Sequence, residues 1–87
     1  MTEREAQIVN PLGLHARPAA QIVRLATSFE SDIRLEKDGM EVNGKSIMGV
    51  MMLSAECGST IRIKAVGGDA ERALEALAQL VAEGFNE

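Results

Sequence analysis

Alternation of apolar and polar residues in short segments is the feature that most constrains what this chain can fold into. Residues 60–66 show it best, because apolar residues at every second position are separated by Arg62 and Lys64. Successive side chains of a strand point to opposite faces of a sheet, so this segment predicts a strand with one buried and one wet face. The same pattern predicts three further strands, at residues 3–9, 32–36 and 40–42. Asp38-Gly39 predicts a tight hairpin between the last two.

Two longer segments have helical spacing instead. Apolar residues recur at every third or fourth position over residues 16–29 and again over residues 70–81, which predicts two amphipathic helices. Asp69 is expected to be the N-cap residue of the second helix, and Gly84 to close it.

A third, shorter helix is predicted at residues 47–53, with Ser46 placed to act as its N-cap. Its residues are apolar nearly all round, whereas so short a helix can bury only one side, and we assign Val50 and Leu53 to the core. Methionine side chains on the other side would fit more than one partner surface. The residues expected to stay partly exposed as this docking surface are Ile47, Met48 and Met51.

The elements follow one another in the order βαββαβα. Strands with one polar face favour an antiparallel sheet whose other face is covered by helices. We therefore predict an α+β fold, a two-layer open-faced sandwich in which a four-stranded antiparallel sheet carries three helices on one face. At 87 residues the chain has room for one small core, so residues 1–87 are expected to form a single domain.

Composition excludes several classes of function. One histidine and one cysteine, Cys57, cannot supply a structural zinc site or an intramolecular disulfide. A net charge of −4 and two phenylalanines without Trp or Tyr disfavour nucleic-acid binding. The longest apolar stretch, residues 47–53, is shorter than the roughly 20 residues that cross a bilayer, and the polar N-terminus has no signal-peptide pattern. We expect a cytoplasmic monomer with no membrane insertion, metal or cofactor.

Acidic residues are absent from two long windows. Residues 6–29 contain Arg17 and Arg24 but no Asp or Glu, and residues 42–55 contain Lys45 but no acid. If the fold places these windows side by side, they form a neutral-to-basic face on an acidic protein, suited to an anionic ligand or an acidic partner.

His15, the only histidine, lies immediately before the first predicted helical residue. Amide N–H groups at a helix start have no intrahelical acceptors and the macrodipole is positive there, so this end attracts anions. Pro18 in the first turn favours helix initiation. Arg17 opposes the dipole at a small cost in stability. That cost indicates a negatively charged visitor, either a free anion or a phosphoryl group on the imidazole itself.

Nucleophilic chemistry at phosphorus fits His15 better than hydrolysis does. A hydrolase needs a nucleophile and an orienting acid near the histidine, yet the surrounding segment has no carboxylate and the chain has no G-x-S-x-G elbow. In the favoured mechanism one ring nitrogen attacks a phosphorus atom, while the helix-end amides and Arg17 stabilise the added charge. The product is a phosphohistidine that must be handed on.

Two segments, GLHARPAA and NGKSIMGVMML, resemble the HPr family, the phosphocarriers of bacterial phosphoenolpyruvate-dependent phosphotransferase systems. The resemblance spans essentially the whole chain. It implies that His15 accepts a phosphoryl group on Nδ1 from phospho-enzyme I and passes it to a histidine of an enzyme IIA protein. It also implies that Arg17 engages the phosphoryl group, that the backbone N–H of Ala16 can reach it, and that the short helix contacts both partner proteins.

Ser46 matches the second site of the family, a serine that an ATP-dependent HPr kinase/phosphorylase modifies in bacteria that have this enzyme. The resemblance thus implies regulatory phosphorylation of Ser46 in addition to its capping role. A phosphate there would sit favourably at a helix N-terminus and would spoil the acid-free face for an acidic partner.

Three alternatives remain open on the sequence. A carrier of the nitrogen-related phosphotransferase branch would have a similar sequence and would signal instead of feeding sugar uptake. An interaction module would dock through the Met-rich helix without being phosphorylated. A small hydrolase or acyltransferase would use His15 as a base. The favoured interpretation is a stoichiometric phosphocarrier in sugar uptake and its regulation, and not a turnover enzyme.

Overall fold

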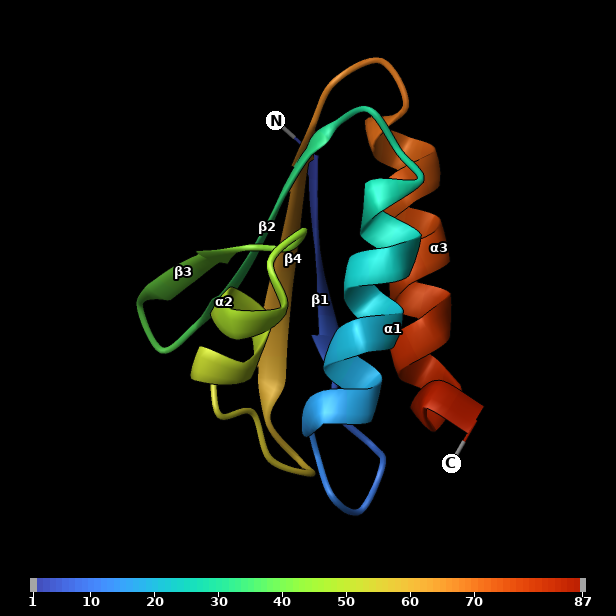
Figure 1. The fold of residues 1–87 in the computed structure, drawn as a ribbon. Coiled ribbons are helices and arrows are strands. Elements are labelled where there is room, and N and C mark those ends of the chain that lie inside the picture. Colours follow the sequence, from blue (N-terminus) through green and yellow to red (C-terminus); the bar gives the residue numbers. More distant parts are fainter. Residues whose placement is uncertain (1, 87) are drawn as a thin grey trace.

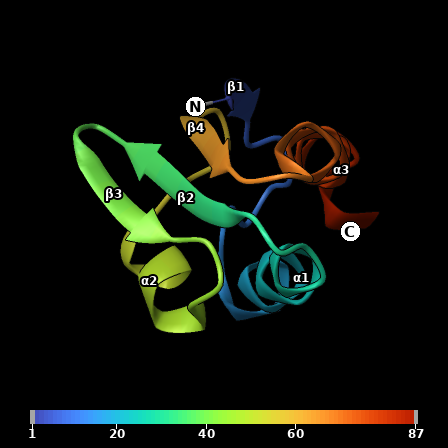
Figure 2. The same cartoon turned by 90° about the horizontal axis from the view of Figure 1, so that it is seen from above.

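Four antiparallel strands form one open sheet in the order β1-β4-β2-β3 (Figure 1). The computed structural model describes residues 2–86. Seen from above, α1, α2 and α3 lie on the same side of the sheet (Figure 2), which confirms the predicted open-faced sandwich and its order βαββαβα. The elements are β1 Thr2–Gln7, α1 Ala16–Thr27, β2 Asp32–Lys37, β3 Met40–Asn43, α2 Ile47–Met52, β4 Thr60–Val66, α3 Ala70–Ala82 and a final 3-10 turn, η1, Gly84–Asn86.

Strand register accounts for the layer between sheet and helices. β4 pairs on both sides, with Ala6 of β1 opposite Ile61 and Ile33 of β2 opposite Ala65. Its apolar positions are buried and its polar ones are not, as the alternation predicts. Helices α1 and α3 turn their apolar stripes toward this surface. The core residues from these elements include Ala19, Ile22, Ala26, Ile33, Leu35, Ile61, Ile63, Ala65, Ala73, Leu74, Leu77 and Val81.

The first strand ends earlier than predicted, at Gln7 instead of Val9. The next residue, Ile8, is buried but bonds to the loop that precedes β4. Its N–H donates to the carbonyl of Ser59 (2.8 Å), and its carbonyl accepts from the N–H of Gly58 (2.7 Å). The chain therefore leaves the ladder here and begins the loop that leads to α1.

Asp69 is the N-cap residue of α3, as predicted, but its side chain makes no capping hydrogen bond. Its carboxylate turns instead to the loop between α1 and β2. There it accepts hydrogen bonds from the N–H of Glu30 (2.9 Å) and from the N–H (3.0 Å) and hydroxyl of Ser31. Hydrogen bonds from the Ser31 hydroxyl and the Glu30 amide hold the pKa of Asp69 at about 2. With this loop pinned, α1 ends at Thr27, before the predicted Phe29.

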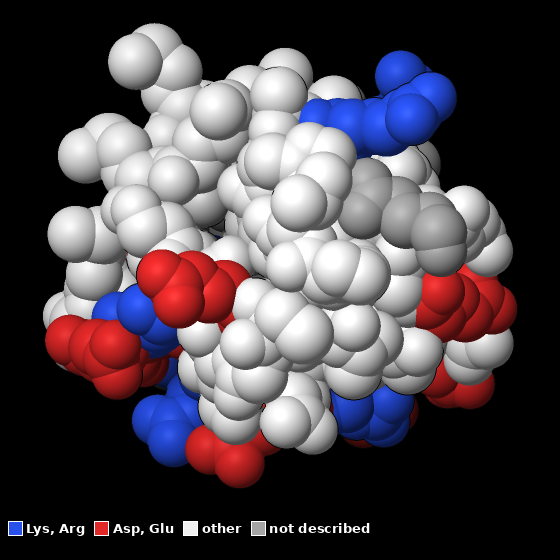
Figure 3. Space-filling model, turned by 90° about the horizontal axis from the view of Figure 1, so that it is seen from below, with Lys and Arg blue, Asp and Glu red and all other residues white. Residues whose placement is uncertain are grey.

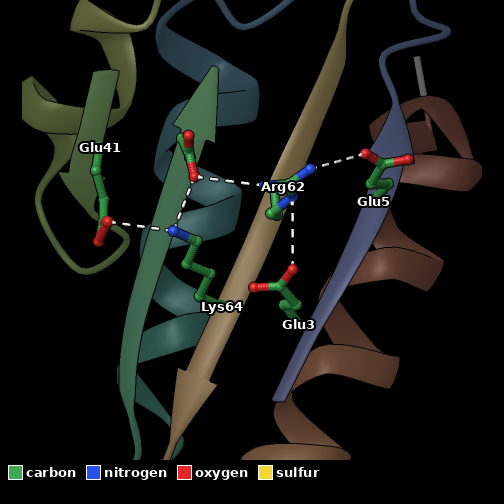
Figure 4. A network of polar contacts seen from close by, with 6 residues as sticks. Glu3, Glu5, Glu41, Arg62 and Lys64 are labelled. Atoms are coloured by element: carbon green, nitrogen blue, oxygen red, sulfur yellow. Dashed lines mark hydrogen bonds and ion pairs between the residues drawn. The ribbon is translucent and has the colours of Figure 1, made fainter. Parts of the chain in front are cut away.

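The outer face of the sheet, opposite the helices, carries a lattice of ion pairs (Figure 4). Lys64 Nζ lies 2.8 Å from Oε1 of Glu36 and 3.4 Å from Oε2 of Glu41. Arg62 Nη2 lies 3.3 Å from Oε2 of Glu5. The hydrogen bond to Glu36 raises the pKa of Lys64, and the same bond lowers the pKa of Glu36. Arg62 also approaches Glu3 and Glu36. Carboxylates outnumber cations in this lattice, so this face is acidic.

Replacement of Asp69 by Asn should lower the free energy of unfolding at neutral pH, because an amide oxygen accepts these hydrogen bonds less strongly than a carboxylate. The folded-state pKa of Asp69 lies below its ordinary value of 3.8. The carboxylate's stabilisation is therefore fully present above that value and is lost as the pH falls toward about 2.

Urea unfolding of both proteins between neutral and strongly acidic pH measures this effect. The difference between wild type and Asp69→Asn should shrink across that acid window. Glu75→Gln, which alters an exposed carboxylate of the same helix, is the matched control and should leave the profile unchanged. A difference that persists unchanged in acid would contradict the role of the charge.

Candidate functional site

The loop before α1 has a shape that only glycine permits at one position. Gly13 has a left-handed φ of +68°, and a Cβ there would lie 2.4 Å from the carbonyl oxygen of Ala55. Asn10 closes the loop, since its Nδ2 donates to the carbonyl of Gly13 (2.7 Å) and its own carbonyl accepts from the N–H of Gly13 (3.1 Å). The N–H of Leu14 donates to the Ala55 carbonyl (2.9 Å). Backbone contacts thus fix the point at which α1 begins.

His15 is the N-cap residue of α1 and has an extended backbone. Its side chain makes no capping bond, so the imidazole is not used to close the helix start. Its carbonyl accepts the hydrogen bond from the N–H of Ala19 (3.0 Å). Pro18 has no N–H, which leaves the amides of Ala16 and Arg17 as the donors at this end. Within residues 2–86 neither amide has a protein acceptor.

An open hollow of about 660 Å³ lies beside this helix start. The imidazole of His15 is half-buried in its wall, and Arg17 is exposed at the same place. The first turn of α1 contains no acid, and among the described residues Arg17 forms no ion pair. Together the amides, the macrodipole and the guanidinium make this a place for an anion. The hollow is lined by Pro11, Leu12, His15, Arg17, Gln21, Phe85 and Asn86.

Helix α2 begins as predicted. Ser46 is its N-cap, with extended backbone, and its Oγ accepts from the N–H of Gly49 (3.1 Å). Val50 and Leu53 are buried, which confirms their assignment to the core, although the helix itself ends at Met52. The three residues expected to stay partly exposed do so, at 44% for Ile47, 76% for Met48 and 42% for Met51.

The two acid-free windows share a face, because α1 packs against α2. At the far end of that contact Lys45 Nζ donates to the carbonyl of Phe29 (2.8 Å). The start of α1 and the loop after α2 lie at the same end of the molecule (Figure 1). Seen from that end, uncharged side chains cover most of the surface and acidic ones keep to its margins (Figure 3). The structure therefore brings His15, Arg17 and the exposed side of α2 onto one largely uncharged surface.

Several residues of this surface are not among those singled out from the sequence. Leu12 and Met52 are 75% and 61% exposed; Leu12 lines the hollow and Met52 is the last residue of α2. Leu12 could have been found from the sequence, because it is an apolar residue in a loop that Asn10, Pro11 and Gly13 otherwise make turn-rich. Phe85 and Gln21 line the hollow, although they lie far from His15 along the chain. An aromatic residue directly after Gly84 was the available signal for Phe85, because apolar residues after a helix-closing glycine often pack back on the helix.

Residues 2–86 contain neither a group of metal ligands nor a helix that could span a membrane. In this range no group of three or more His, Cys, Asp or Glu side chains could hold a metal ion. None of the helices in this range has the length and apolar character needed to cross a membrane.

Comparisons with known proteins agree with the geometry. A family model described as "PTS HPr component phosphorylation site" matches residues 2–83. Phosphocarrier protein HPr of Cupriavidus necator is 45% identical over 87 residues, which cover all of this chain and 98% of that protein. The crystal structure of HPr-C-His from Thermoanaerobacter tengcongensis has a TM-score of 0.96 at 46% identity, over 100% of this chain and 98% of that one. An HPr dimer from the same organism has a TM-score of 0.80 at 46% identity, over 100% of both chains. Matches of this extent show that the chain belongs to the HPr family of phosphocarrier proteins of the phosphotransferase system.

Proposed function

We propose that the chain carries its phosphoryl group on His15, accepts it from phospho-enzyme I and passes it to a histidine of an enzyme IIA protein. The observation that carries this proposal is the half-buried imidazole at the start of α1, beside Arg17 and two amides without protein acceptors among the described residues. In this proposal the protein is a stoichiometric carrier in sugar uptake and its regulation.

The proposed transfer exchanges one P–N bond for another. The lone pair of His15 Nδ1, the nitrogen that the family pattern implies, attacks the phosphorus of the donor's phosphohistidine. The bond from phosphorus to the donor nitrogen breaks and its electron pair returns to the donor ring. In the second transfer His15 is the donor: the acceptor histidine's nitrogen attacks the phosphorus and the bond from phosphorus to His15 Nδ1 breaks. Neither transfer consumes water.

Charge stabilisation falls to groups that are already in place. The amides of Ala16 and Arg17 point out of the helix start and can donate to phosphoryl oxygens, and the helix macrodipole adds to them. The guanidinium of Arg17 supplies a full positive charge. Because the hollow is open, a partner's imidazole can approach the phosphorus from the side opposite His15.

Docking is proposed to use the exposed side of α2. Ile47, Met48 and Met51 lie on the same surface as the hollow, together with Leu12 and Met52. Flexible methionine side chains suit a carrier that must fit two different partners in turn. Acidic side chains keep to the margins of this surface (Figure 3), which favours acidic partners. A small interface releases quickly, and complementary charge speeds its formation.

Ser46 is proposed to be a regulatory phosphorylation site for an HPr kinase/phosphorylase. It lies at the N-cap of α2, next to the docking residue Ile47. A phosphate there would place negative charge on the surface that an acidic partner approaches. Capping and regulation are compatible, since a phosphate oxygen can also accept hydrogen bonds at a helix start.

We propose that the chain is a monomer. Because an HPr dimer from Thermoanaerobacter tengcongensis has a similar structure, the oligomeric state of this chain should be measured. In this structure β1 pairs with β4 of the same chain, so the fold is complete without a partner. Sedimentation at several protein concentrations should give one species of monomer mass. A concentration-dependent heavier species would contradict this.

Incubation with enzyme I and radiolabelled phosphoenolpyruvate should give an acid-labile phosphate on the wild-type protein and none on His15→Ala. Ser46→Ala is the control and should label like wild type. Turnover of an ester or other substrate without an adduct would favour the hydrolase alternative, and absence of label would favour the interaction module. Exchange with the nitrogen-related enzyme I and IIA pair in place of the sugar-specific pair would assign the other branch.

Removal of the Arg17 charge should slow phosphoryl transfer. Loss of one donor to developing charge typically costs about 100-fold or more in a closed site, and this site is open, so we expect roughly 10- to 100-fold for Arg17→Ala. Arg24→Ala removes a second arginine of α1 about two turns away and is the matched control. Rapid-quench measurements of the rate of phosphoryl transfer from enzyme I compare both variants with wild type. Equal effects of the two variants would contradict a specific role for Arg17.

A negative charge at position 46 should weaken binding to enzyme I. Ser46→Asp and Ser46→Asn both keep a side-chain acceptor for the Gly49 amide, and only the first adds charge. We expect Ser46→Asp to raise the Kd severalfold more than Ser46→Asn does, with the gap narrowing at high salt because exposed charges are screened. Calorimetry at two salt concentrations measures both effects. Equal Kd values for the two variants would contradict the electrostatic reason.

A further inference from the structure

The C-terminal turn η1 has an unusual backbone. Gly84, Phe85 and Asn86 have left-handed φ values of 65°, 59° and 60° in succession. A side chain disfavours this conformation, above all a large one such as that of Phe85. A disfavoured conformation persists only where its surroundings hold it, and such residues cluster at functional sites.

Three contacts hold η1 in place. The ring of Phe85 is part of the hydrophobic core and only 2% exposed. The backbone of Gly84 lies against the loop that leads to His15, since a Cβ there would be 3.6 Å from Cγ2 of Val9. Gln21 of α1 donates from Nε2 to the carbonyl of Phe85 (3.3 Å) across 64 positions of sequence.

These contacts place η1 at the site. Phe85, Asn86 and Gln21 line the same hollow as His15 and Arg17. Gln21 follows Arg17 by four residues, so both side chains project from one face of α1. The turn lies beside the N-terminal part of this helix in the ribbon (Figure 1). It therefore forms part of the wall of the hollow that Arg17 also lines.

We propose that Gln21 is a positioning residue for phosphoryl transfer. By holding η1 against α1, its amide fixes the wall that limits the swing of Arg17 and keeps the guanidinium beside His15. The inference rests on the proposed function, and in it Gln21 acts on the phosphoryl group through η1 and Arg17. The burial of Phe85 anchors the turn to the core, so the part-exposed hydrogen bond from Gln21 serves the geometry of the wall more than the stability of the fold.

Gln21→Met tests the proposal, because it keeps the length of the side chain and removes the donor. The rate of phosphoryl acceptance from enzyme I should fall by about threefold to tenfold, less than for Arg17→Ala because the guanidinium is displaced and not removed. The melting temperature should stay close to that of wild type, because the hydrogen bond is part-exposed. Gln79→Met removes an equivalent amide, which donates to Glu83 (2.8 Å) on α3 away from the hollow, and should leave the rate unchanged.

A double-mutant cycle separates positioning from a general structural effect. In an Arg17→Ala background, Gln21→Met should cause no further loss of rate, because the group it positions is gone. A full additional loss in that background overturns the proposal, as does a wild-type rate for Gln21→Met alone.

A second readout keeps the inference distinct from the proposed function. Inorganic phosphate added to the unmodified protein should shift the amide resonances of Ala16 and Arg17, and Gln21→Met should raise the apparent Kd severalfold. If wild type takes no label from enzyme I, the proposed function fails and this titration alone decides. An unchanged Kd in that case overturns the positioning role.

Discussion

The close approach of Gly13 to the carbonyl of Ala55 is the contact on which the site depends. It brings the loop before α1 against the loop after α2. The hydrogen bond from the N–H of Leu14 to the same carbonyl fixes the position of one loop relative to the other. A Cβ at position 13 would force the loops apart, because its near neighbour is backbone and cannot turn aside. The imidazole and the docking helix therefore keep their relation through main-chain contacts, which surface substitutions leave intact.

Segregation of charge follows from the topology. β4 lies inside the sheet and carries Arg62 and Lys64 on its outer face, where carboxylates from β1, β2 and β3 surround them. The carboxylates of Glu3, Glu5, Glu36 and Glu41 are thereby gathered on the side opposite the helices. Arg17 and Arg24 lie on the helical side, in a window without acid. The sheet thus separates part of the molecule's acid from the window that contains Arg17 and Arg24.

Local patterns were sufficient for most of the fold and for the centre of the candidate site. Alternation predicted which face of β4 is buried, and the spacing of Val50 and Leu53 predicted the buried side of α2. Asp69 shows where such reasoning fails. Its preference for N-caps is a local property, whereas its actual donors lie 38 and 39 positions away and compete successfully for the carboxylate. The place of Phe85 in the wall of the hollow likewise depends on how the last turn packs, which spacing along one helix does not encode.

The proline in the first turn of α1 has a consequence for how firmly a phosphoryl group would be held. Pro18 withdraws one amide from the helix start, so two N–H groups remain to meet a group that presents more oxygens than they can bind. The protein would bind only some of the phosphoryl oxygens and leave the others to solvent or to the acceptor protein. Incomplete binding keeps the phosphorylated state from being much more stable than the donor and acceptor states. Neither transfer then has a large unfavourable change in free energy. Direction would come from the phosphorylation levels of the partners on either side.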